Sequence, residues 1–171
     1  MSYKASAPGS LMLLGEHAVL HGGQALVAAI NYRMHVTLSP RNDSTIKVHS
    51  ALGDFECEIA NLNDVPAFVP FEFILTALKQ YQKQLVTGFE LEVQSEFSHQ
   101  IGFASSAAVT VATLRVIHAW LNISATDEEL ILSARKIVRE VQGIGSGADV
   151  AASVLGGVVA FRAEPFSSEK L

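Results

Sequence analysis

Short segments in which apolar and polar residues alternate fill the first third of the chain, and they predict a sheet. Two strands are expected within residues 2–14, on either side of a turn at Pro8 and Gly9. Turn-forming residues such as Pro40, Asn42 and Gly53 separate several of the segments that follow. These further strands are expected at 25–30, 34–38, 45–50 and 55–59.

Apolar residues at helical spacing replace this alternation in the rest of the chain. The spacing predicts a helix from 70 to about 85, followed by a strand over 89–93. A long apolar helix is expected over about 105–121, and a capping-box sequence at Thr126 begins another. A strand over 158–161 comes last. Strands and helices mixed in this order, without a repeat or a linker, predict one α+β domain.

Composition narrows the class of protein. The chain has 171 residues, 49% of them hydrophobic, and a mean hydropathy of +0.30. No segment approaches the roughly 18 uninterrupted apolar residues of a membrane span, and the amino terminus lacks a secretory pattern. The single cysteine, Cys57, forms no internal disulfide, which favours the cytoplasm. The net charge of −5, with scattered lysines and arginines, argues against a nucleic-acid partner.

Residues 101–108 read Ile, Gly, Phe, Ala, Ser, Ser, Ala, Ala and stand where the long apolar helix begins. The start of a helix leaves backbone N–H groups without partners and carries a partial positive charge, so it can bind an anion. Gly102 and Ala104 keep this backbone accessible, while Ser105 and Ser106 offer hydroxyls to a phosphate or to its Mg²⁺. The segment is also compatible with an ordinary N-cap.

Two further segments carry side chains suited to a reaction. In 7–23, an expected strand and turn lead to a Gly, Glu, His triplet that contains Glu16 and His17. In 143–152, a glycine-rich loop delivers Asp149 to the start of a short helix. His17 is also compatible with a structural histidine, and Asp149 with a helix N-cap.

Together, and in this order, the three segments resemble the signature motifs of the GHMP kinases, a superfamily of small-molecule kinases. His17 and the residues after it are most similar to the mevalonate kinases, whereas the loop before Asp149 is closer to the phosphomevalonate kinases. The resemblance extends over residues 5–155. It implies an α+β fold of the ribosomal protein S5 domain 2-like type, a mixed sheet packed against helices.

The resemblance also implies an activity: with Mg²⁺, the γ-phosphoryl group of ATP is transferred to the hydroxyl of a small-molecule alcohol, with mevalonate the expected acceptor. Asp149 would be the catalytic residue, as general base or as an orienting acceptor. The remaining roles fall on three groups of residues. They are the ATP phosphate ligands Gly102, Phe103, Ala104, Ser105, Ser106 and Ala107, the substrate contacts Glu16, His17 and Ser146, and the metal ligands Ser105, Ser106 and Glu140.

The chain departs from the motifs at several positions. Ser10 stands where mevalonate kinases usually have a lysine, and Ala104 where the family commonly has glycine. Val138 stands where the acidic Mg²⁺ ligand is expected, with Glu140 two positions away. The losses at Ser10 and Val138 favour an alternative, a degenerate and non-catalytic nucleotide-binding module.

The resemblance covers only the amino-terminal half of such kinases. Residues 1–171 are therefore expected to form the ATP- and substrate-binding domain, with the carboxy-terminal GHMP domain absent from this chain. An uncovered surface would then lead to self-association, giving a homo-oligomer, or to binding of a separately encoded carboxy-terminal half. A phosphomevalonate kinase-like enzyme, and an S5-like interaction domain that binds no nucleotide, are the other interpretations.

Overall fold

The computed structural model describes residues 1–66, 71–98 and 102–171. Pro70, the expected start of a helix, and Ile101, the first residue of the candidate phosphate turn, lie outside the described residues. The strands are β1 Tyr3–Leu14, β2 Gln24–Pro40, β3 Thr45–Ser50, β4 Gly53–Glu58, β5 Phe89–Ser95, β6 Val158–Arg162 and β7 Ser167–Lys170. The α-helices are α1 Glu72–Gln80, α2 Ser105–Leu121, α3 Asp127–Gln142 and α4 Ala148–Leu155, with short 3₁₀ helices at Ala18–His21, Ile59–Asp64 and Gln82–Gln84.

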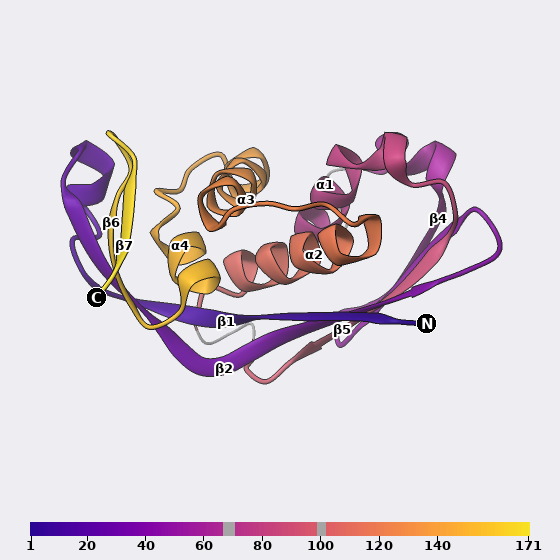
Figure 1. Cartoon of the computed structure of the whole chain (residues 1–171), viewed down its shortest axis with the longest axis horizontal. Helices are drawn as coiled ribbons and strands as arrows, with labels where there is room; N and C mark the ends of the chain where they lie inside the picture. The colour runs from indigo at the N-terminus through magenta and orange to yellow at the C-terminus, as the bar shows by residue number, and fades with distance from the viewer. Residues whose placement is uncertain (67–70, 99–101) are drawn as a thin grey trace.

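The strands form one mixed sheet in the order β4-β3-β5-β2-β6-β7, and β1 pairs with β2 outside this path. β3 and β5 are parallel, whereas the other pairs are antiparallel. Figure 1 shows the four α-helices on one side of the sheet, with β1 and β2 running along most of its length. The α+β class expected from the order of elements is therefore confirmed.

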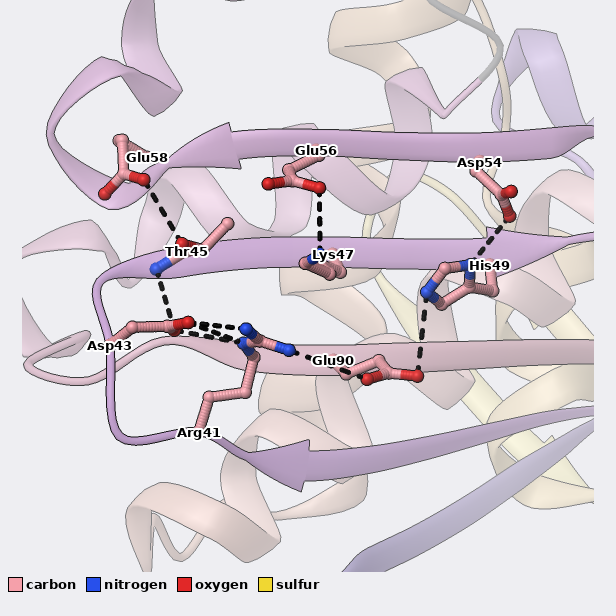
Figure 2. Close-up of polar contacts among 9 residues, drawn as sticks. All are labelled: Arg41, Asp43, Thr45, Lys47, His49, Asp54, Glu56, Glu58 and Glu90. Carbon is pink, nitrogen blue, oxygen red and sulfur yellow. Dashed lines mark hydrogen bonds and ion pairs between the residues drawn. The ribbon is translucent and has the colours of Figure 1, made fainter.

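The alternation in β3, β4 and β5 separates an apolar face from a charged one. Ile46 and Phe89 are fully buried in the core. On the opposite face, Figure 2 shows rows of polar side chains that cross the three strands. Lys47 lies 3.0 Å from a Glu56 carboxylate oxygen, in the position opposite it in the ladder. Such cross-strand pairs hold the register of an exposed sheet face and explain the period of two in this part of the sequence.

The two longest strands each replace two expected ones. β1 continues through Pro8 and Gly9, and β2 joins the expected strands at 25–30 and 34–38. The register between β1 and β2 shifts between Pro8 and Ser10, since Pro8 faces Arg33 while Ser10 faces Ala29. Residues 30–32, which are Ile, Asn and Tyr, have no partner in β1 and form this irregularity instead of a loop. The predicted breaks were therefore wrong, because both halves of β2 pair with β1.

The expected helix over 105–121 is confirmed as α2, and the capping box at Thr126 is present at the start of α3. The expected helix over 70–85 is shorter, since α1 ends at Gln80. Sequence reasoning missed β7, a short polar strand paired with β6, because it has no apolar alternation. Nowhere in the described ranges is a helix long and apolar enough to cross a membrane.

Candidate functional site

A cavity of about 320 Å³ brings together residues that are far apart in the sequence. Ser10 comes from β1, the segment 102–106 from the start of α2, and Asp149 from the first turn of α4. The described residues that line it are Ser10, Met12, Val27, Gly102, Phe103, Ala104, Ser105, Ser106 and Asp149. The structure thus places the candidate phosphate turn and the candidate catalytic carboxylate around one space.

Two hydrogen bonds, one donated and one accepted by the backbone of β1, connect the segments that form this cavity. The Ser10 backbone N–H donates to the Phe103 carbonyl at 3.1 Å, which joins β1 to the segment before α2. The hydroxyl of Ser153, fully buried on α4, donates to the Pro8 carbonyl at 2.9 Å. Gly9 lies between the two bonds, and a Cβ there would be 2.7 Å from the Phe103 carbonyl oxygen. The close approach of these segments therefore requires glycine at this position.

The start of α2 is open toward the cavity. Its N-cap residue, Ala104, has φ 53° and ψ 48° and makes no side-chain capping bond. The first intrahelical hydrogen bond runs from the Ala108 N–H to the Ala104 carbonyl, at 3.1 Å. The N–H groups of the residues just before Ala108 therefore have no acceptor within the helix. In α3, by contrast, Thr126 caps the helix with its side chain. An uncapped helix start beside a cavity can accept an anion such as phosphate.

The left-handed backbone of Ala104 gives a stability prediction. A residue with a Cβ is strained in this conformation, whereas glycine adopts it freely. We expect Ala104→Gly to raise the free energy of unfolding by about 0.5 to 1 kcal/mol, the relief of strain exceeding the added entropy of the unfolded chain. Urea unfolding measures the change. Ala125→Gly, at an exposed position without a positive φ, is the control and should lower stability. An equal loss in both variants would contradict strain at Ala104.

Asp149 is half-buried and has no ion-pair partner among the described residues. One carboxylate oxygen accepts a hydrogen bond from the Val150 N–H at 2.9 Å. Burial raises the pKa of Asp149 above its usual value, and this backbone bond opposes the shift. Among the described residues that line the cavity there is no lysine, arginine or histidine, and the family's lysine position is occupied by Ser10, which is 2% exposed. The Asp149 carboxylate is the single charged side chain among these described lining residues.

A second, larger cavity of about 520 Å³ shares Ser105 and Ser106 with the first. Its walls are mainly apolar and come from β2, β5, α1 and α2, together with the turn between β3 and β4. They include Met34, Leu52, Phe71, Phe73, Ile74, Val93, Phe97 and Val109. Sequence reasoning missed this cavity, because its residues look like ordinary core positions and no local motif connects them.

The other candidate residues do not line either cavity. Glu16 and His17 are exposed at the start of the 3₁₀ helix Ala18–His21. The Ser146 hydroxyl accepts a hydrogen bond from the Ala148 N–H at 3.3 Å, within the loop that precedes Asp149. Ala107, a candidate phosphate contact, is fully buried in the core.

The structure does not bring Glu140 to the cavity. Glu140 is exposed on α3 and is not among the residues that line the cavity. Val138, which stands where the resemblance places the acidic Mg²⁺ ligand, is only 3% exposed. A Cβ on Gly145 would lie 3.9 Å from a Val138 methyl group, which places Val138 beneath the glycine-rich loop.

Comparison with known proteins gives two family matches. A profile described as the GHMP kinases N terminal domain matches residues 72–157, a segment that contains the start of α2 and Asp149. A profile described as the galactokinase galactose-binding signature matches residues 3–40, which form β1 and β2 and the 3₁₀ helix between them.

Individual proteins match the chain over nearly its whole length. The chain is 33% identical over 154 residues to the mevalonate kinase of Archaeoglobus fulgidus, covering 90% of this chain and 50% of that protein. It is 30% identical to the mevalonate kinase of Pyrococcus horikoshii, covering 95% and 52%. The structure of Methanococcus jannaschii mevalonate kinase superposes with a TM-score of 0.88 at 22% identity, covering 100% of this chain and 56% of that one. Lactococcus lactis galactokinase gives 0.87 at 21% identity, covering 98% and 46%. The chain spans about half the length of the curated relatives it matches.

Proposed function

Because the chain belongs to the GHMP kinases, whose N-terminal domain it matches, we propose that it binds MgATP and serves phosphoryl transfer to a small-molecule alcohol. The observation that carries the proposal is the convergence of an uncapped helix start, two serine hydroxyls and one carboxylate on a single cavity. Phosphoryl transfer depends on positioning and on neutralising charge, and these groups supply the positioning.

The phosphates of ATP would lie at the start of α2, against the backbone of 102–106. Ser105 and Ser106 offer hydroxyl oxygens, and oxygen is the ligand that Mg²⁺ prefers. Within the described ranges, no group of three or more His, Cys, Asp or Glu side chains is placed to hold a metal ion. We therefore propose that Mg²⁺ arrives with the phosphates, which supply most of its ligands. When bound, it would neutralise phosphate charge that no basic side chain among the described lining residues balances.

Asp149 would accept a hydrogen bond, or a proton, from the hydroxyl of the acceptor. Its carboxylate borders the same space as the phosphate turn, so an acceptor bound there would meet both the nucleotide and the carboxylate. A raised pKa makes a carboxylate a stronger base, which suits this role. Glu16, His17 and Ser146 remain proposed contacts to the more distant part of the acceptor.

The apolar cavity would take the base of the nucleotide. It shares Ser105 and Ser106 with the phosphate site, so one extended ligand can occupy both spaces. Cavities for cofactors are mostly apolar and bury the ring of the ligand, and a volume of about 520 Å³ is in the usual range. Phe71 and Phe97 line this cavity and offer aromatic surfaces to a purine.

Mevalonate is the acceptor we propose first, because several curated proteins that match nearly the whole chain, such as those of Archaeoglobus fulgidus and Pyrococcus horikoshii, are mevalonate kinases. A sugar is the second candidate, favoured by the match of residues 3–40 to a galactose-binding signature. A phosphomevalonate kinase-like acceptor and a non-catalytic nucleotide module remain outcomes of the same test.

Calorimetric titration tests the proposal. We expect the 171-residue chain to bind ATP in the presence of Mg²⁺ and more weakly with EDTA, and mevalonate to bind the MgATP complex. Galactose replaces mevalonate in a parallel titration. Turnover of the isolated chain should stay far below the roughly 10 s⁻¹ of a typical enzyme, because it spans half of its relatives. Nucleotide binding without any acceptor would favour the non-catalytic module. Absence of nucleotide binding by folded protein would refute the proposed function.

A further inference from the structure

The helix that carries Asp149 is short and is attached at its far end by an arginine. α4 has eight residues, with Asp149 in its first turn and Val154 in its last. The last carbonyls of a helix have no intrahelical donors, and this end carries a partial negative charge. Arg115 supplies both a donor and a positive charge at this end of α4, since its Nη2 donates to the Val154 carbonyl at 2.8 Å.

Arg115 also bonds the strand beneath the helices. Its Nη1 donates to the Ser6 carbonyl of β1 at 3.1 Å. Arg115 itself belongs to α2, so one side chain connects α2, β1 and α4. These are the three elements that contribute the phosphate turn, Ser10 and Asp149 to the cavity. The bonds lie away from the cavity, since Arg115 does not line it.

We propose that Arg115 is a positioning residue that fixes the place of Asp149 relative to the phosphate turn. This inference rests on the proposed function. A helix of two turns moves as a unit. Without the Arg115 bond, its last turn keeps, among the described residues, only the Ser153 hydrogen bond to Pro8 of β1 and loses its side-chain bond to α2, so the carboxylate at its first turn would be displaced. Displacement of a reacting group by about 1 Å can cost about 100-fold in rate.

The geometry requires a guanidinium at this position. Arg115 donates in two directions from two nitrogen atoms, and a lysine ammonium on a flexible stem cannot hold both carbonyls in the same planar arrangement. The side chain is half-buried, and burial lowers the pKa of Arg115, an effect that Asp127 opposes and Arg33 adds to. A buried cation needs these acceptors to offset its desolvation.

Arg33 provides a matched control for the β1 bond. Its Nη2 donates to the same Ser6 carbonyl at 3.2 Å, and its Nε donates to the Ser6 hydroxyl at 2.9 Å. No hydrogen bond from Arg33 reaches α4 within the described part of the chain. Arg33→Met therefore removes a guanidinium from Ser6 and leaves the attachment of α4 intact.

The test compares Arg115→Met, Arg115→Lys and Arg33→Met in a catalytically active form of the protein, such as the chain completed by the half that its relatives also contain. For Arg115→Met we expect kcat to fall by more than 10-fold while the dissociation constant of MgATP stays within about 3-fold, because the phosphate turn itself is unchanged. Arg115→Lys should lie between it and the parent. Arg33→Met should keep kcat within about 2-fold. Added methylguanidinium should restore part of the kcat of Arg115→Met, and thermal unfolding confirms that each variant is folded.

Equal losses of kcat in the Arg33 and Arg115 variants would overturn the inference, because the effect would then come from β1. Unchanged kcat in folded Arg115→Met would overturn it as well, and so would a loss of nucleotide binding equal to the loss of kcat. If Arg115→Met fails to fold, Arg115→Lys decides the matter by the same criteria of kcat and MgATP affinity. A parent protein that binds no nucleotide would refute the proposed function, and this outcome is distinct from the others.

Discussion

Asp149→Asn is expected to lower kcat by at least about 100-fold in a catalytically active form of the protein, with the dissociation constant of MgATP within a few-fold of the parent. An amide keeps the shape of the side chain and cannot accept the proton of the acceptor hydroxyl. A group that acts mainly in the transition state contributes to kcat and little to binding of the ground state. Steady-state kinetics and calorimetry measure the two quantities.

Glu140→Gln is the matched control, since Glu140 is an exposed carboxylate on the neighbouring helix α3. It should leave kcat and the Mg²⁺ dependence unchanged. If Glu140→Gln weakens the response to Mg²⁺, Glu140 is a metal ligand after all. A kcat for Asp149→Asn within tenfold of the parent would remove Asp149 from the catalytic role.

The same substitution should stabilise the fold at neutral pH. Burial raises the pKa of Asp149, so the ionised carboxylate is less favourable in the folded chain than in the unfolded chain. This cost is present above the folded pKa and disappears at acid pH, where the carboxyl is protonated in both states. Asp149→Asn should therefore raise Tm by a few degrees at pH 7 and have a smaller effect near pH 3. A lower Tm at pH 7 would contradict the cost assigned to burial.

Gly102→Val is expected to weaken binding of MgATP by more than tenfold. Gly102 lines the cavity at the start of α2, and apart from its chain neighbours no heavy atom of the described residues lies within 4 Å of a Cβ built there. The new side chain therefore points into space that the described residues leave open and where the phosphates are proposed to lie. Gly102→Ala, with a smaller side chain, should have an intermediate effect.

Calorimetric titration of folded Gly102→Val with MgATP measures this change, and thermal unfolding shows whether the variant is intact. Unchanged affinity in a folded variant would mean that the phosphates bind elsewhere. A large loss of stability would contradict the open space around Gly102.

Elements with local signals were predictable from the sequence, and elements defined by distant pairing were not. α2 and α3 follow from helical spacing and from the capping box at Thr126. The continuity of β2 was missed, because its two halves are joined by pairing with β1, which the pattern of residues 30–32 does not reveal.

The candidate site also has parts that the sequence predicts and parts that depend on distant contacts. Each of the segments around Glu16, Ser105 and Asp149 could be recognised from its own residues, and their order matched the family resemblance. That Ser105 and Asp149 border one cavity, while Glu16 does not, depends on how β1 bonds to the segment before α2 and to α4. The apolar cavity has no local signal, because its walls come from several elements and consist of residues that any core contains.

The bond from Ser153 to Pro8 joins residues 145 positions apart in the chain, and β6 pairs with the first half of β2. Contacts between such distant positions form slowly, because the loop between them must first be closed. During synthesis from the amino terminus, β1 and the phosphate turn leave the ribosome well before α4 and β6. The cavity is therefore among the last parts of the domain to be assembled. A nascent chain that ends before residue 153 should consequently have its helix α2 but no competent nucleotide site.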